Sequence, residues 1–241
     1  MSLPSDFEDR LRKIYEHEDH ALDAYNAEKD VLMPALRKIA EDLAPQYKVI
    51  EPIGRGGAAV VIKVHEEQLG ALRALKVPRP KDPTLIDSVR NEIAHLTALI
   101  HDHIIRLHKM GTVDLPNFCL PYPYFVMDYI PSRTNLRDDL EKRLAEVKRA
   151  RDLRMVTAYL LDRLAEVGAA LGYLHSNDII HFDVKPSNIL IDERGKIRLS
   201  DLGFAKKKSA DQNKTIVGLP FSTPTLACGL NISTCPPVTG C

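Results

Sequence analysis

The stretch from Ile179 to Gly203, IIHFDVKPSNILIDERGKIRLSDLG, constrains the fold of this chain more than any other segment. Apolar runs at 179–180, 189–191 and 197–199 are separated by polar residues, which is typical of short strands joined by turns. The sequence DERG at 192–195 predicts a hairpin between the last two strands. The polar residues in the other loops could converge on one centre that binds a metal ion and phosphate groups: Asp183, Lys185, Asn188 and Asp201.

Composition narrows the class of protein. The chain has 241 residues, with 33 basic and 33 acidic side chains and a formal net charge of zero. This balance argues against a general electrostatic grip on nucleic acid or on an anionic membrane. No apolar run approaches the roughly 20 residues that span a bilayer, and the polar start MSLPSDFEDRLRK is not a signal peptide. Four cysteines without a regular pairing pattern suggest a reducing compartment, so we expect a cytoplasmic protein with no nucleic-acid and no membrane partner.

The first 45 residues predict a helical extension that packs on or beside the next domain. Apolar residues recur every three or four positions between residues 5 and 43, and Pro34 predicts a break or a second helix start near residue 33. The cluster EHEDH at 16–20 could bind a metal ion. A solvated helix face is the better interpretation, because the cluster offers only two imidazoles on a polar surface.

From Tyr47 the apolar pattern changes from helical to strand-like. We expect strands over 47–53, 60–65, 72–77, 104–110 and 124–128, with a longer loop over the proline-rich residues 113–123. The first two strands flank the sequence GRGGAA at 54–59. Glycines there would let backbone amides approach a polyphosphate, although most glycine-rich turns are simple hairpins.

A lysine and a glutamate 16 residues apart predict a buried ion pair. Ala74 and Lys76 share one face of the third strand, because side chains alternate along a strand. The residues from 86 to 100 have the apolar stripe of a helix, and Glu92 lies on or beside that stripe. A carboxylate that faces a core requires a cation, and Lys76 is the natural partner. Further along, 136–154 predict a charged, solvated helix, and 156–174 a helix with a strong apolar stripe.

The order and spacing of these segments resemble the protein kinase family. The run HFDVKPSN at 181–188, followed 13 residues after Asn188 by DLG, resembles the catalytic and metal-binding loops. The loop at 54–61 resembles the phosphate-binding loop, with Ala59 at the third glycine position. The pair Lys185-Pro186 resembles serine/threonine-directed kinases. The resemblance implies an α+β bilobal fold, with a five-stranded N-lobe sheet, an αC helix that carries Glu92, and a helical C-lobe.

The same resemblance implies roles for individual residues. Asp183 would orient the acceptor hydroxyl, and Lys185 would neutralise the transferring phosphoryl group. Asn188 and Asp201 would hold Mg²⁺, and Lys76, held by Glu92, would bind the phosphates of ATP. Met127 would be the gatekeeper before the hinge. The other residues expected to contact the nucleotide are Ile53, Gly54, Gly56, Val61, Ala74, Asp128, Ile130 and Leu190.

The resemblance has departures and a limit. Phe182 replaces the arginine that pairs with a phosphorylated activation loop, so we expect that form of switching to be absent. Leu202 replaces a phenylalanine and keeps an apolar side chain. The pattern runs from about residue 47 to 222, after which 225–241 contain three cysteines and no charged residue. We therefore expect an N-lobe over 46–131, an incomplete C-lobe over 132–224, and a disordered tail from a truncated or frameshifted end rather than a zinc site.

Three functions follow, from different classes. The first is an ATP-dependent protein kinase that phosphorylates serine or threonine, represented by an incomplete domain. The second is an inactive truncated kinase or pseudokinase that acts as a binding module. The third is a small-molecule kinase, against which the pattern D-x-K-P-x-N at 183–188 argues.

Overall fold

The computed structural model describes residues 3–16, 21–80, 82–116, 121–131 and 134–207. Met1–Lys207 form one compact unit, and the architecture given below is that of this unit. Several expectations fall outside the described residues. They concern most of the cluster at 16–20, the centre of the loop at 113–123, the segment at 208–224 and the tail at 225–241.

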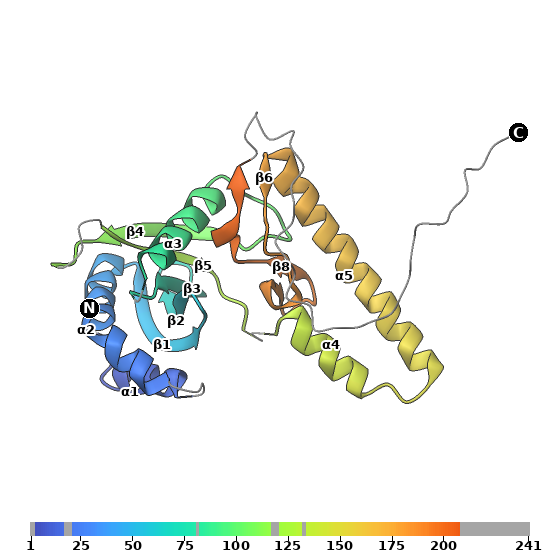
Figure 1. Ribbon diagram of the computed structural model, residues 1–241, viewed down its shortest axis with the longest axis horizontal. Helices are drawn as coiled ribbons and strands as arrows, with labels where there is room; N and C mark the ends of the chain where they lie inside the picture. Colours follow the sequence, from blue (N-terminus) through green and yellow to red (C-terminus); the bar gives the residue numbers. More distant parts are fainter. Residues whose placement is uncertain (1–2, 17–20, 81, 117–120, 132–133, 208–241) are drawn as a thin grey trace, which may run out of the picture. The chain divides into compact units, whose positions relative to one another are not determined.

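The element order alternates between helical and strand-rich segments (Figure 1). The helices are α1 (Phe7–Tyr15), α2 (Ala21–Leu43), α3 (Pro83–Leu96), α4 (Leu136–Ala145) and α5 (Ala150–Ser176), with the short 3₁₀ helices η1 (Pro186–Asn188) and η2 (Leu202–Phe204). The strands are β1 (Tyr47–Arg55), β2 (Ala59–Glu66), β3 (Ala71–Pro78), β4 (Leu107–Val113), β5 (Tyr122–Asp128), β6 (Ile179–Ile180), β7 (Ile189–Ile191), β8 (Ile197–Leu199) and β9 (Lys206–Lys207).

The first five strands form one antiparallel sheet in the order β1-β2-β3-β5-β4, which confirms the five predicted strands. Apolar side chains are buried on both of its faces. On β5, for example, Tyr124 and Val126 lie in one hydrophobic cluster, whereas Phe125 and Met127 lie in another. Side chains alternate along a strand, so the two clusters lie on opposite faces.

The two N-terminal helices cover the first of these faces. The cluster that holds Tyr124 and Val126 also contains Phe7 and Leu11 of α1 and the buried stripe of α2, in which Leu32, Leu36, Ile39 and Leu43 are at most 1% exposed. Figure 1 shows both helices beside the sheet. The N-terminal extension therefore contributes a full hydrophobic core to the sheet.

The opposite face packs against α3 and against the elements that follow β5. Val89 and Leu96 of α3 share a cluster with Phe125, with Val167, Ala170 and Leu174 of α5, and with apolar residues of β6, β7 and β8. The predicted short strands pair as expected: β7 with β8 in a hairpin, and β6 with β9. Gly195 in the hairpin turn has φ of 72°, a conformation that glycine adopts without strain.

The predicted break near residue 33 is wrong, because α2 continues from Ala21 to Leu43 with Pro34 inside it. A proline inside a helix removes one backbone hydrogen bond and costs about 3 kcal/mol. Met33, Ala35 and Leu36, its neighbours, are buried against the sheet. Burial of this stripe offsets the local cost, as tertiary packing often does.

Two other boundaries differ from the prediction. The charged stretch 136–154 is divided between α4 and α5, because the Asp152 carboxylate accepts the backbone N–H groups of Lys148 and Arg149 and so starts a new helix. The fourth strand starts at Leu107 rather than at 104. The backbone at 104–105 pairs instead with Leu199 of β8, whose carbonyl accepts the N–H of Ile105.

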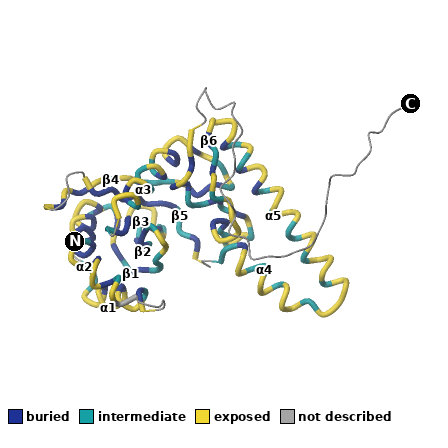
Figure 2. The backbone as a smooth tube through the Cα atoms, viewed as in Figure 1, coloured by how far each residue is buried: buried dark blue, intermediate teal, exposed yellow. Residues whose placement is uncertain are grey.

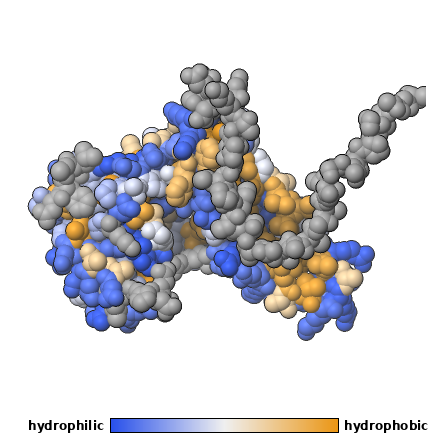
Figure 3. Space-filling view, in the orientation of Figure 1, coloured by the Kyte–Doolittle hydropathy of each residue, from blue (hydrophilic) through white to orange (hydrophobic). Residues whose placement is uncertain are grey.

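Only the C-terminal part of α5 is buried in the core. Leu153, Met155, Leu161 and Leu164, in its first two thirds, are at least half exposed. Figure 2 shows this part of the helix as largely exposed, and Figure 3 shows hydrophobic side chains gathered over it. None of the helices in the described part of the chain is both long and apolar enough to cross a bilayer.

The packing of α2 on the sheet predicts a large effect of one substitution. Leu36→Ala should lower the free energy of unfolding by about 2–5 kcal/mol, the usual cost of deleting a buried leucine side chain. The matched control is Leu161→Ala, which removes the same atoms from a side chain that is 61% exposed and should change stability by less than about 0.5 kcal/mol. Urea unfolding of the full chain measures both. Equal effects would contradict the packing described for α2.

Candidate active site

The cavity that contains the predicted residues lies between the sheet and the loops that follow α5. It has a volume of about 400 Å³. Its lining includes every residue expected to contact the nucleotide and both expected Mg²⁺ ligands: Ile53, Gly54, Gly56, Val61, Ala74, Lys76, Glu92, Met127, Asp128, Ile130, Leu190, Asn188 and Asp201. Asp183 and Lys185 are not part of the lining, but Asp183 is bonded to Asn188.

The sheet register explains the apolar part of this lining. Ala74 of β3 pairs directly with Met127 of β5, and Val61 of β2 pairs with Lys76. These residues share the face opposite the N-terminal helices. Ile53 from β1 and Leu190 from β7 add apolar side chains from two further strands.

The predicted ion pair forms at the back of the cavity. The Lys76 ammonium lies 2.6 Å from Oε2 of Glu92 on α3 and 3.4 Å from Oδ1 of Asp201. Burial acts to lower the pKa of Lys76, but the charges of Glu92 and Asp201 outweigh it and raise that pKa. Burial also raises the pKa of Glu92, against the opposing effect of Lys76. Lys76 therefore stays charged, and the pair ties α3 to β3 and to the loop that carries Asp201.

The loop from 181 to 188 brings three polar side chains together. The Asn188 amide group donates to the backbone carbonyl of Asp183 at 2.9 Å and to its carboxylate at 3.0 Å. The Lys185 ammonium lies 2.7 Å from the same carboxylate. A 3₁₀ turn at Pro186–Asn188 allows this return of the chain. Asp183, Lys185 and Asn188 thus form one connected group, as the spacing predicted.

A second set of contacts fixes this loop to the one that carries Asp201. The Asn188 carbonyl accepts both the N–H and the hydroxyl of Ser200, at 2.9 and 3.0 Å. His181, 1% exposed, lies 3.2 Å from the Ser200 carbonyl, and burial lowers the pKa of its imidazole. Asp201 has a left-handed backbone with φ of 66°, uncommon for a residue with a side chain. Strained backbone of this kind is often found at functional sites.

Phe182 lies where the resemblance expects an arginine. Its backbone φ is 62° and its side chain is 40% exposed, so the ring is not buried in the hydrophobic core. The Lys206 ammonium lies 5.7 Å from the centre of its ring. The expected absence of switching through a phosphorylated activation loop stays a prediction, because residues 208–224 lie outside the described part of the chain.

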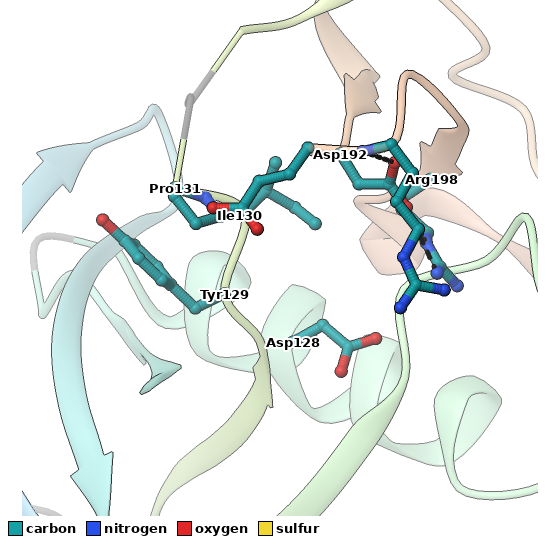
Figure 4. Close-up of a pocket in the computed structure, with 8 residues that line it drawn as sticks. Asp128, Tyr129, Ile130, Pro131, Asp192 and Arg198 are labelled. Atoms are coloured by element: carbon teal, nitrogen blue, oxygen red, sulfur yellow. Dashed lines mark hydrogen bonds and ion pairs between the residues drawn. The ribbon is translucent and has the colours of Figure 1, made fainter. Parts of the chain in front are cut away.

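The end of β5 and the linker that follows it line the cavity with Asp128, Tyr129 and Ile130, and the Asp128 side chain is held by neighbouring groups. The Asp128 carboxylate accepts the Arg106 N–H at 3.1 Å and lies 2.7 Å from Nε2 of His108. Burial acts to raise its pKa, but these two hydrogen bonds outweigh burial and hold the pKa below its usual value. Figure 4 shows this linker across a smaller pocket of about 190 Å³ from Asp192 and Arg198, which bond to each other. The side chain of Asp128 is therefore occupied.

The donor set of the cavity fits a nucleotide with a hard cation. Because the amide nitrogen of Asn188 donates to Asp183, its amide oxygen is the atom left to bind a cation. The Asp201 carboxylate lines the same cavity, and oxygen ligands of this kind suit Mg²⁺. The apolar walls of the cavity suit a nucleotide base, and backbone groups at 128–130 suit the polar edge of that base. The Lys76 ammonium suits a phosphate chain.

Sequence reasoning missed some of the residues near the cavity. Arg55, Gly57, Ala58, Tyr129, Ser187 and Ser200 also line it. It also missed a buried ion pair behind the loop at 54–59, between Glu28 of α2 and Arg79. A signal was present, because Glu28 falls in the apolar stripe of α2 between Tyr25 and Leu32. Glu28, like Glu92, is a carboxylate that faces a core and therefore requires a cation.

Comparison with known proteins agrees with this geometry. The family described as "Protein kinase domain" matches residues 47–226. A relative named serine/threonine-protein kinase PknB, from Mycolicibacterium smegmatis, is 28% identical over 74% of this chain. Probable serine/threonine-protein kinases of Streptomyces coelicolor and Clostridium acetobutylicum are 31% and 26% identical, over 68% and 79% of the chain.

The matches cover only part of each relative. This chain corresponds to 28% of the length of the Mycolicibacterium and Clostridium proteins and to 23% of the Streptomyces protein. The family match covers three quarters of this chain's residues, from β1 onward, and the described α+β architecture agrees with the bilobal kinase fold. The chain therefore belongs to the protein kinase family, in its eukaryotic-like serine/threonine branch.

Proposed function

We propose that this chain contains an ATP-dependent protein kinase site that transfers the γ-phosphate of ATP to serine or threonine hydroxyls of a protein substrate. The observation that carries the proposal is the convergence of Lys76, Asn188 and Asp201 on one cavity, with Asp183 bonded to Asn188. These side chains come from a strand and from two separate loops. The cytoplasmic location of the protein and the absence of a nucleic-acid partner stay predictions from composition.

The division of the kinase domain into an N-lobe over 46–131 and an incomplete C-lobe over 132–224 stays a prediction from the sequence. Ile53, Val61, Ala74 and Leu190 would enclose the base. Backbone groups of Asp128 and Ile130 would bind its polar edge, beside Met127. This assignment agrees with Asp128, whose carboxylate is already bonded to His108 and to the Arg106 N–H.

The glycines of the loop at 54–59 support a phosphate-binding role. A Cβ placed on Gly57 would meet no atom within 4 Å, and one on Gly56 would meet only the Ala59 carbonyl at 3.8 Å. Neither glycine has a positive φ. Protein packing and backbone strain therefore do not require glycine at these two positions, whereas close approach of a phosphate chain does.

Phosphoryl transfer depends mainly on position and on charge neutralisation. Asn188 and Asp201 would hold Mg²⁺, which supplies positive charge to the phosphates when bound. Lys76, fixed by Glu92, would bind the phosphates nearer the base. Asp183 would accept a hydrogen bond from the acceptor hydroxyl and orient it, while Lys185 would neutralise the transferring group.

The first prediction from the proposed function concerns activity. Asp183→Asn and Asp201→Asn should each reduce phosphoryl transfer by at least about 100-fold, because each removes a charge that orients a reacting group or a cation. The measurement is transfer of labelled γ-phosphate from Mg·ATP to the chain itself and to a panel of protein acceptors, followed by identification of the phosphorylated residue. The control is Asp178→Asn, the same change at an exposed residue in the turn before β6, which should keep full activity.

Other outcomes separate the alternatives. Stabilisation of the chain by Mg·ATP without any transfer, unchanged in Asp183→Asn, would replace the proposal with a non-catalytic nucleotide-binding module. Transfer to small metabolites and to no protein would indicate a small-molecule kinase. Equal activity in Asp183→Asn and Asp178→Asn would contradict the role given to Asp183.

The second prediction concerns the ion pair. Lys76→Met should lower the free energy of unfolding by about 3–5 kcal/mol at neutral pH, because it leaves the buried Glu92 carboxylate without its cation. Burial raises the pKa of Glu92 above its unfolded value, so in this variant stability should be greatest at low pH and should decrease as pH rises above the usual glutamate range. Urea unfolding between pH 5 and 8 measures this. In the double variant Lys76→Met/Glu92→Gln the additional pH dependence should disappear; its persistence would show that another group titrates.

A further inference from the structure

A buried charge pair links the N-terminal helices to the loop above the cavity. The Arg79 side chain, 6% exposed, follows β3 directly, and the Glu28 side chain on α2 is 1% exposed. Two nitrogens of the Arg79 guanidinium bond to the Glu28 carboxylate, at 2.5 to 3.1 Å. The third guanidinium nitrogen donates to the carbonyl of Gly57 at 3.1 Å and lies 3.5 Å from that of Gly56. Arg79 thus spans from α2 to the loop.

Helix α1 completes this arrangement through Tyr15. Its hydroxyl donates to Glu28 at 2.7 Å, and its ring is fully buried. The Arg55 guanidinium, at the start of the loop, lies 4.6 Å from the centre of the same ring. The backbone N–H of Arg79 bonds to the Ala58 carbonyl at 2.9 Å. The loop is therefore held at both of its ends by groups that meet at Tyr15 and Glu28.

Burying these charges is expensive unless they are fully bonded. Burial acts to lower the pKa of Arg79, but the hydrogen bonds and charge of Glu28 outweigh it and raise that pKa. Burial, with Glu28, raises the pKa of Tyr15, so the hydroxyl keeps its proton and remains a donor. The hydrophobic cluster between the helices and the sheet already joins these layers. The hydrogen bonds of a charged group also fix the orientation of the groups they join, which apolar contact does not do.

The orientation of the Gly56 and Gly57 carbonyls also determines where the neighbouring backbone N–H groups point. In a trans peptide the carbonyl of one residue and the N–H of the next point in opposite directions. With the carbonyls of Gly56 and Gly57 turned toward Arg79, the N–H groups of Gly57 and Ala58 turn away from it. Gly57 and Ala58 line the cavity, whereas Arg79 is not among the described residues that do. Arg79 thus orients two backbone donors away from the helices, on the side where the cavity lies.

We infer that Glu28 and Arg79, supported by Tyr15, are positioning residues that hold the backbone amides of the loop at 54–59 for the phosphate chain of the nucleotide. This inference rests on the proposed function, since it requires the cavity to bind ATP. It assigns to the N-terminal helices a share of the nucleotide site, although they precede the residues that match the kinase family.

The test compares two ligands that differ only in the phosphate chain. Mg·ATP and adenosine binding are measured by calorimetry on the full chain and on Arg79→Lys. This variant keeps the charge beside Glu28, but its single ammonium cannot also reach the carbonyls as the guanidinium fork does. Its affinity for Mg·ATP should fall about tenfold, the effect of one lost hydrogen bond to a charged group, while that for adenosine changes less than about twofold. Glu28→Gln should also lower the affinity for Mg·ATP more than the affinity for adenosine.

A matched pair of tyrosine variants separates this role from general packing. Tyr15→Phe removes the hydroxyl bonded to Glu28, and Tyr25→Phe removes a hydroxyl that bonds to Glu8 at 3.2 Å, between the same two helices but not linked to the loop. Only Tyr15→Phe should lower the affinity for Mg·ATP more than the affinity for adenosine. If both variants act alike, or if folded Arg79→Lys binds Mg·ATP as the wild type does, the inference is wrong.

Hydrogen exchange gives a readout that does not depend on the ligand. Backbone amides at 54–59 should exchange faster in Arg79→Lys and Tyr15→Phe than in the wild type, and should be unchanged in Tyr25→Phe. A wild-type chain that binds no Mg·ATP would overturn the proposed function, and with it the phosphate-binding role of these residues. Unchanged exchange at 54–59 in Arg79→Lys would overturn the inference alone.

Discussion

Burial of both faces of the five-stranded sheet is the constraint on which the rest of this structure depends. On β5 six of seven residues are buried, and on β2 and β3 apolar residues of both phases are buried. A sheet with two apolar faces must be covered on both. One face is covered by α1 and α2, and the other by α3, whose hydrophobic cluster extends to α5 and to the short strands β6, β7 and β8. The N-terminal helices are therefore as necessary to the sheet as the elements around the site.

The same alternation distributes two cations to opposite faces near the end of β3. Lys76 shares its phase with Ala74, on the cavity face, whereas Arg79 shares its phase with Leu75 and Val77, on the helix face. Each cation meets a carboxylate from the apolar stripe of a helix, Glu92 on α3 and Glu28 on α2. The two pairs have similar chemistry. The first joins a helix to the cavity, and the second joins a helix to the loop above it.

The sequence predicted the parts of this structure that follow from local pattern and spacing. Period-two runs located the five strands, and the expectation that a buried carboxylate requires a cation located Glu92 and Lys76. Hydrophobic periodicity failed at two places for different reasons. Burial of the neighbouring side chains carries α2 through Pro34, which is an effect of tertiary packing. The Asp152 side chain starts α5 inside a charged stretch by a local cap, which periodicity does not reveal. Arg79 was missed because nothing in a run V-P-R-P distinguishes a buried arginine from an exposed one. Only the position of Glu28 in its stripe carried that information.

Coupling between the helices and the nucleotide must be reciprocal if Arg79 orients the loop. A ligand that binds better when the loop is held will also strengthen the contacts that hold it, by the same free energy. The coupling passes through few groups, since Arg79 alone bonds to both Glu28 and the glycine carbonyls among the described residues. Whatever loosens α1 or α2 from the sheet would then weaken phosphate binding before it disturbs Lys76, Glu92 or Asp201. The N-terminal helices thus offer a route by which the affinity of the site for nucleotide could change while its reacting groups remain in place.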